Sequence, residues 1–152
     1  MPQTGRVEWI GLRPARDVDM ASVEQVSVDP SIGLHGDRYA GRSRTRQVTL
    51  IQAEHLPVIA SCVGLPCVAP QLLRRNIVVR GINLLALKGK IIHIGEVDLE
   101  ITGLCHPCSK METRLGAGGY NAMRGHGGMT ARVLTPGVIA LGDTLHYTIL
   151  PD

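Results

Sequence analysis

Residues 90–102 read KIIHIGEVDLEIT, and this stretch carries the clearest structural signal in the chain. From Val97 to Ile101, apolar residues alternate with acidic ones, which is the period of a strand with one buried face. Gly95 and Glu96 separate this run from a second apolar run by two residues, the spacing of a tight hairpin. The stretch therefore predicts two antiparallel strands that share one side of a hydrophobic core.

Similar short runs recur along the rest of the chain, between turns rich in the 18 Gly and 9 Pro. The expected strands are residues 23–28, 46–51, 76–80, 90–94, 97–102, 130–134, 137–141 and 144–150. The helical pattern is limited to residues 52–63, with Pro57 in the first turn, and residues 69–75, which Pro70 begins. Many short strands at regular spacing predict a mainly β fold, either a barrel or a closed sandwich, with one or two short helices.

Length and composition restrict the class of protein. A chain of 152 residues with 44% hydrophobic and 19% charged residues is typical of a single globular domain, here residues 1–152. It contains no Phe, so its core has to be aliphatic, and nucleic-acid bases would find few rings to stack on. A net charge of +3 also gives little attraction for nucleic acid. Since no apolar run is long enough for a membrane span or a signal peptide, we expect a cytoplasmic protein without nucleic-acid or membrane partners.

Thirteen of the sixteen basic residues are arginines, a bias that a GC-rich genome would also produce. They cluster at Arg38, Arg42, Arg44 and Arg46, and again at Arg74, Arg75 and Arg80. The planar guanidinium grips phosphate or carboxylate through two parallel hydrogen bonds, so these clusters indicate one anionic ligand.

Two glycine-rich stretches, residues 33–46 and 116–128, do not fit a strand pattern. The second has six glycines in thirteen residues, with Tyr120, Arg124 and His126 among them. Such density lets backbone N–H groups approach a ligand closely, and it is equally typical of an exposed surface loop.

The sharpest chemical motif is LCHPCSK at residues 104–110, directly after a predicted strand. Three chemistries compete for its two thiols. Cys105 and Cys108 could form a zinc site with Cys62 and Cys67, although those two are more typical of plain buried thiols. A redox dithiol would normally open a helix, and no helix is predicted after the motif. A single thiolate that ligates a soft metal is the third interpretation.

Six motifs, in chain order, resemble the MOSC domain, which occurs in molybdenum-cofactor sulfurases and amidoxime-reducing proteins. They are GLHGDR at 33–38, RQVTLI at 46–51, LRRNIVVRGI at 73–82, LKG and IGEV at 87–97, PC at 107–108, and GMTARVL with GD at 128–143. The resemblance spans about residues 30–145 and suggests a small stand-alone bacterial-type member. It implies a distorted β-barrel that binds the molybdenum cofactor, molybdopterin with molybdenum.

The resemblance also implies roles for particular residues. Cys108 occupies the position of the protein's thiolate ligand to molybdenum, and we expect His106 and His35 to act as proton sources beside it. The residues expected to hold the cofactor are Arg38, Arg46, Arg74, Arg75, Asn76, Asp37 and Arg132. For Asn76 a turn cap, for Asp37 satisfaction of backbone N–H groups, and for Arg132 an outward orientation remain open alternatives. Cys105 could carry sulfur, pair with Cys108 or only pack.

Family enzymes reduce N-hydroxylated small molecules, so we expect an oxidoreductase of this kind. The sequence shows no iron–sulfur domain, and a separate electron-donor protein would then supply the electrons. Two alternatives stay open: a non-catalytic carrier of the molybdenum cofactor or of activated sulfur, and a structural zinc protein that uses the four cysteines. A homo-oligomer is compatible with the sequence, and a recombinant sample could lack the cofactor.

Overall fold

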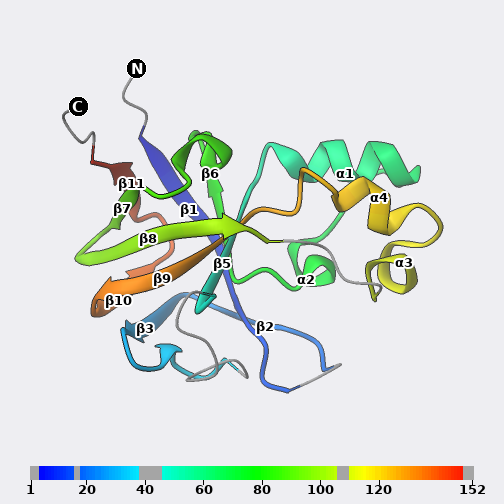
Figure 1. Cartoon of the computed structure of the whole chain (residues 1–152). Helices are drawn as coiled ribbons and strands as arrows, with labels where there is room; N and C mark the ends of the chain where they lie inside the picture. The colour runs from blue at the N-terminus through cyan, green and yellow to red at the C-terminus, as the bar shows by residue number, and fades with distance from the viewer. Residues whose placement is uncertain (1–3, 16–17, 38–45, 106–109, 149–152) are drawn as a thin grey trace.

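The structure, a computed structural model, describes residues 4–15, 18–37, 46–105 and 110–148 (Figure 1). The strands are β1 Gly5–Leu12, β2 Ala21–Val23, β3 Gln25–Asp29, β4 Gly33–Leu34, β5 Val48–Gln52, β6 Ile77–Arg80, β7 Ile91–Ile94, β8 Val97–Leu104, β9 Met129–Thr135, β10 Gly137–Ala140 and β11 Thr144–Tyr147. The helices are α1 His55–Val63, α2 Pro70–Leu73, α3 Lys110–Leu115 and α4 Gly119–Met123, with a 3₁₀ turn at Leu84–Leu87. The prediction of a mainly β barrel with a few short helices is confirmed.

In the described part of the chain, seven strands close into a barrel in the order β11-β7-β8-β9-β5-β6-β1. The barrel closes because β1 also pairs with β11, with Gly5 opposite Leu145 and Arg6 opposite Thr144. Strand β2 extends the sheet beyond β1, and β10, β3 and β4 form a small separate sheet. The predicted hairpin of β7 and β8 is confirmed, with Ile94 opposite Val97.

Aliphatic side chains fill the barrel, as the absence of Phe requires. The alternating residues Val97, Leu99 and Ile101 of β8 are fully buried. Opposite walls contribute Ile77, Val79 and Leu145 among other branched side chains to the same core. Burial of each such side chain contributes about 1.5–3 kcal/mol, so this cluster provides the main stabilisation of the barrel.

A second core lies between the outside of the barrel and the helices, which Figure 1 shows gathered at one side of the molecule. Strand β5 is buried along its whole length, because its Ile51 side chain faces this second core while Leu50 faces the first. Helices α1 and α2 connect β5 to β6, which run parallel to each other. The longest helix in the described residues, α1, has nine residues, and no helix there is long and apolar enough to cross a membrane.

Helices α3 and α4 and strands β1, β2 and β4 were not predicted from the sequence, apart from Val23 at the end of β2. Helix α3 begins at Lys110, so the expectation that no helix follows the cysteine motif is wrong. Helices α3 and α4 are too short to show a helical period, and they form because Met111, Leu115 and Met123 pack into the second core. Strand β1 was missed because its register shifts between Val7 and Trp9, which interrupts the alternation that marks a strand.

Candidate functional site

A cavity of about 520 Å³ opens where the C-terminal end of β8 meets the segment around α4. Its described lining consists of Leu104, Cys105, Tyr120, Arg124, Gly125, Gly127 and Gly128. The volume falls within the range of small-molecule pockets, roughly 300–1,000 Å³. The glycine-rich stretch 116–128 is therefore part of the wall of a cavity, and the end of a barrel strand forms the rest.

Arg75 holds two sides of this cavity together. Its Nε donates to the carbonyl of Gly127 at 2.7 Å, and its Nη2 donates to the carbonyl of Cys105 at 3.4 Å. Nη1 donates to the carbonyl of Leu73 at 3.0 Å, and the whole residue is only 6% exposed. One buried cation therefore fixes the end of α2, the end of β8 and the glycine-rich wall relative to one another.

Position 128 can hold only a glycine, because the backbone packs closely there. Its φ is +87°, and a Cβ built there would lie 2.0 Å from the carbonyl oxygen of Leu50. Its carbonyl accepts a hydrogen bond of 2.9 Å from the N–H of Cys105. The glycine thus lets the cavity wall lie directly against the barrel strands β5 and β8.

A buried polar network lies near the start of β6. The Asp37 carboxylate accepts two hydrogen bonds from the Arg13 guanidinium, at 3.1 and 2.9 Å, and one from the Arg13 backbone N–H at 2.9 Å. Asn76, which is fully buried, donates to Asp37 Oδ1 at 3.1 Å and to the carbonyl of Gly11 at 3.0 Å. Its Oδ1 accepts from the hydroxyl of Thr49 at 3.0 Å and from Arg13 at 3.2 Å. The structure thus brings Asp37 and Asn76 together, in contacts that tie β1, β5 and β6.

Arg13 belongs to this network, and the sequence analysis missed it. It is 8% exposed and directly follows β1, the strand whose pattern the bulge hides. With β1 unrecognised, no signal in the sequence placed Arg13 near Asp37 or Asn76. The order Arg13-Pro14 is compatible with many surface turns.

Arg74 bonds other partners than Arg75 and Asn76 do, although the three residues are consecutive. It ends α2 with a left-handed backbone, φ +61°, and it is the one non-glycine residue with positive φ in the described part of the chain. Its guanidinium donates to the carbonyls of Ala15, at 3.2 Å, and Val18. The left-handed turn lets successive side chains reach three different parts of the structure.

Other predicted site residues lie away from the cavity. Arg132 pairs with Glu100 on the exposed face of β9, so its outward orientation is the one observed. Arg46 is exposed just before β5. The half-exposed ring of His35 lies 2.6 Å from Asp29 in the small sheet. The hydroxyl of Ser31 and this ring hold the pKa of Asp29 well below its usual range. Cys108, His106 and Arg38 lie outside the described residues.

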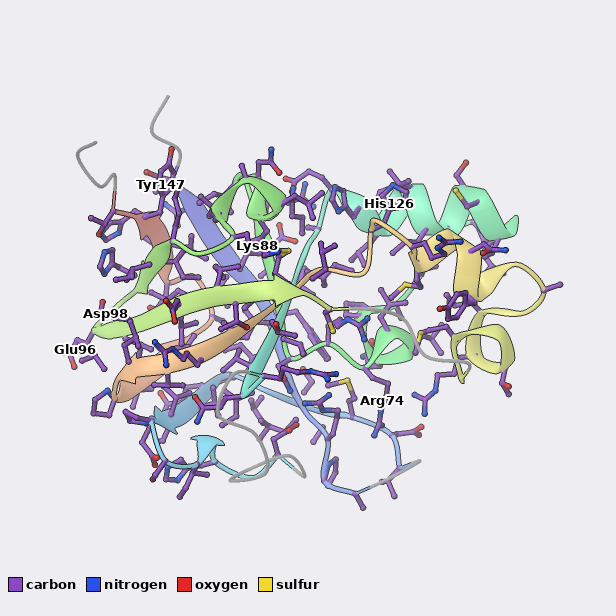
Figure 2. All side chains as sticks on the ribbon, in the orientation of Figure 1. Arg74, Lys88, Glu96, Asp98, His126 and Tyr147 are labelled. Atoms are coloured by element: carbon purple, nitrogen blue, oxygen red, sulfur yellow. The ribbon has the colours of Figure 1, made fainter. Side chains whose placement is uncertain are left out.

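A pair of histidines links the cavity wall to α1. The rings of His55 and His126 meet edge to face, with centroids 5.5 Å apart, and Figure 2 shows His126 beside α1. Burial lowers the pKa of His55, the nearby His126 lowers it further, and the Glu54 carboxylate opposes the shift. His126 Nδ1 lies 3.1 Å from the carbonyl of Ala122, so that nitrogen is the one that carries the proton. The two rings thus pack together beside Gly125 and Gly127.

The cysteines do not form a cluster in the described part of the chain. Cys62 and Cys67 are exposed, so the expectation that they are buried thiols is wrong; they lie at the end of α1 and beyond it, outside the second core. Cys105 is buried. Among the residues that the structure describes, no group of three or more His, Cys, Asp or Glu could hold a metal ion.

The sequence of the chain matches a family model. The model of the MOSC domain covers residues 34–146, which is most of the chain and includes β5–β9, the cavity wall and Cys108. This chain belongs to the MOSC domain family. A comparison with curated protein sequences gave no match.

Solved structures share the fold of this MOSC protein at low sequence identity. The YuaD protein from Bacillus subtilis is 20% identical, with a TM-score of 0.85, over 98% of this chain and 99% of its own. YiiM from Geobacillus stearothermophilus is 18% identical, with a TM-score of 0.77, over 95% of this chain and 75% of its own. YiiM from Escherichia coli is 19% identical, with a TM-score of 0.70, over 99% and 71%. These likenesses establish the barrel.

The MOSC family is associated with the molybdenum cofactor, and the cavity is compatible with such a group. Its described lining contains no carboxylate that would repel the phosphate of such a group. The described backbone of Gly125, Gly127 and Gly128 leaves part of the wall without side chains. Cys105 borders the cavity, and Cys108 follows three residues later in the sequence.

Proposed function

We propose that this protein is a molybdenum-dependent oxidoreductase that reduces N-hydroxylated small molecules. The observation that carries the proposal is the position of the cavity in a MOSC domain. The cavity opens at the end of β8, where Cys105 lines it and the family's Pro-Cys motif follows at residues 107–108. A thiolate at Cys108 would complete a sulfur-rich set of ligands for the metal of a bound cofactor.

When bound, the molybdenum cofactor would supply the two-electron chemistry that removes an oxygen atom. The net reaction adds two electrons and two protons to an N–OH group, and the products are an N–H group and water. The electrons come from a separate donor protein. His106 is the proton source that the sequence places nearest to Cys108, and His35 is the other candidate.

The chain's own residues would bind and orient the cofactor and the substrate. Arg75 acts by keeping the two sides of the cavity together, since its guanidinium already bonds the carbonyls of Cys105 and Gly127. Asp37 and Asn76 support the start of β6 behind it. Arg38 is the remaining arginine that we propose to serve the cofactor. Arg46, Arg74 and Arg132 are not part of the described lining, and Arg74 and Arg132 bond other groups.

The ligand role is tested by metal and pterin analysis of the protein prepared without oxygen. We expect molybdenum and pterin fluorescence to copurify with the wild type and with Cys62→Ser, whose exposed thiol lies on α1. In Cys108→Ser the molybdenum content should fall at least about tenfold, because a hydroxyl is a poor ligand for a soft metal centre. Full molybdenum occupancy in Cys108→Ser would show that another group ligates the metal.

Turnover separates an enzyme from a carrier. With a chemical reductant in place of the donor protein, the molybdenum-loaded protein should convert benzamidoxime to benzamidine, and Cys108→Ser should not. A loaded protein that shows no turnover would instead favour the carrier of cofactor or activated sulfur. Stoichiometric zinc without molybdenum would favour the structural zinc protein.

A further inference from the structure

The wall of the cavity that α4 provides combines an apolar surface with a positive charge. Tyr120 lies in α4 and is 38% exposed, and Leu104, across the cavity at the end of β8, is 46% exposed. Arg124 follows α4 directly and also lines the cavity. Other apolar side chains of this protein are also exposed, but Tyr120 and Leu104 line one cavity together with a cation, and this combination indicates a surface for a ligand.

Arg124 is available to an anion. No hydrogen bond or ion pair joins its guanidinium to any residue in the described parts of the chain, in contrast to Arg13, Arg75 and Arg132. Its backbone N–H donates to the carbonyl of Asn121 at 3.2 Å, which fixes the main chain from which the side chain extends. Gly125 follows, and a Cβ built there meets nothing within 4 Å, so the cavity wall directly after Arg124 is open.

We propose that Arg124 and Tyr120 determine which substrate this cavity accepts: a flat ring that carries a carboxylate or phosphate. The ring packs against Tyr120 and Leu104, and the anionic group receives paired hydrogen bonds from Arg124. This inference rests on the proposed function, because it assigns the ligand to the substrate. A neutral compound with the same ring keeps the apolar contact and loses the ionic one, and a cationic compound meets the like charge of Arg124.

The test uses a matched pair of N-hydroxylated compounds, 4-carboxybenzamidoxime and benzamidoxime. Their Kd for the purified protein is measured by calorimetry, and their KM in the reductase assay. The wild type should bind the carboxylated compound about tenfold more tightly, the effect of one charge-assisted contact. Arg124→Gln should remove this preference and leave the Kd of benzamidoxime unchanged.

Two further variants make the result specific. Arg6→Gln removes another exposed arginine, which lies on β1 and outside the described lining of the cavity, and should keep the tenfold preference. Tyr120→Ala should raise the Kd of both compounds by a similar factor. Tyr120→Phe keeps the ring and should bind both compounds with wild-type affinity. Equal affinity for the two compounds in the wild type, or an unchanged preference in Arg124→Gln, would overturn the inference.

Molybdenum content and turnover complete the design. If Arg124→Gln loses the metal while Arg6→Gln keeps it, Arg124 serves the cofactor, and the assignment to substrate is overturned. If the wild type binds the carboxylated compound through Arg124 and reduces neither compound, the proposed reaction fails while the binding preference stands. If it reduces both with equal KM, the reaction stands and the preference fails.

Discussion

At the scale of single residues, Arg13 and Asp37 form a buried ion pair in which each charge requires its partner. The side chains are 10% and 1% exposed, and both carboxylate oxygens accept from the guanidinium. A charge buried to this extent is tolerated only while its partner remains, because leaving water costs each ion several kcal/mol. The pair therefore fixes the chain after β1 to the chain after β4.

Replacing one member of this pair should be costly. Asp37→Asn removes the carboxylate charge that the buried Arg13 guanidinium bonds through two of its nitrogens, so we expect the free energy of unfolding to fall by about 3 kcal/mol or more. Urea denaturation followed by circular dichroism measures this loss. Asp19→Asn removes an exposed carboxylate in the same region and should change stability by about 0.5 kcal/mol or less. A loss in Asp37→Asn no greater than that of the control would mean that water reaches the Arg13 guanidinium.

Sequence reasoning selected Asp37 and Asn76 as polar residues beside a glycine-rich stretch and a strand. Their hydrogen-bond partners could not be predicted, since Arg13, Thr49 and Gly11 come from distant parts of the chain. A direct role of Asp37 and Asn76 at a cofactor remains a prediction.

Among the elements, the segment from α3 to β9 differs most from expectation. Glycines dominate the sequence of this segment, and the prediction of an irregular stretch overlooked α4. Gly125 and Gly128 both have positive φ, +79° and +87°, but their surroundings differ. A Cβ at Gly128 meets the Leu50 carbonyl at 2.0 Å, whereas a Cβ at Gly125 meets nothing within 4 Å.

These two glycines allow a direct comparison of backbone strain with backbone contact. Gly125→Ala should cost about 1 kcal/mol, the penalty of a left-handed backbone for alanine. Gly128→Ala adds a collision with a barrel strand, so the free energy of unfolding should fall by at least about 3 kcal/mol. Thermal and urea unfolding of the two variants measure the difference. Similar losses would show that the cavity wall can move away from β5 without further cost.

At the scale of the whole molecule, the barrel depends on the pairing between β1 and β11. Among the described residues, this seam pairs Gly5 with Leu145 and Arg6 with Thr144, and it continues through the hydrogen bonds between Val7 and residues 142–143. The seam between β8 and β9 extends from Asp98 opposite Thr135 to Leu104 opposite Met129. Barrel closure therefore depends on the shorter of these two seams.

The shorter seam should open first. In native-state hydrogen exchange we expect the Val7 amide, which donates to the Asp143 carbonyl, to exchange with an opening free energy at least about 1 kcal/mol below that of the β8 and β9 amides. The Asn76 amide, which donates to Thr49 inside the barrel wall, serves as a protected internal reference. Equal protection of Val7 and the β8 amides would indicate that the barrel opens only by global unfolding.

The sequence by itself determined the mainly β class, the hairpin of β7 and β8, the aliphatic core and the membership of the MOSC family. These features depend on local alternation, on turn residues and on motifs that keep their order along the chain. The tertiary structure alone decided the closure by β1, the short helices α3 and α4, and the assembly of the cavity from the end of β8 and the glycine-rich wall. A bulge conceals β1, the helices owe their stability to the second core, and Arg75 connects carbonyls that lie far apart in the sequence. These features depend on contacts between residues that are far apart in the sequence, and a local sequence pattern does not show which distant residues meet.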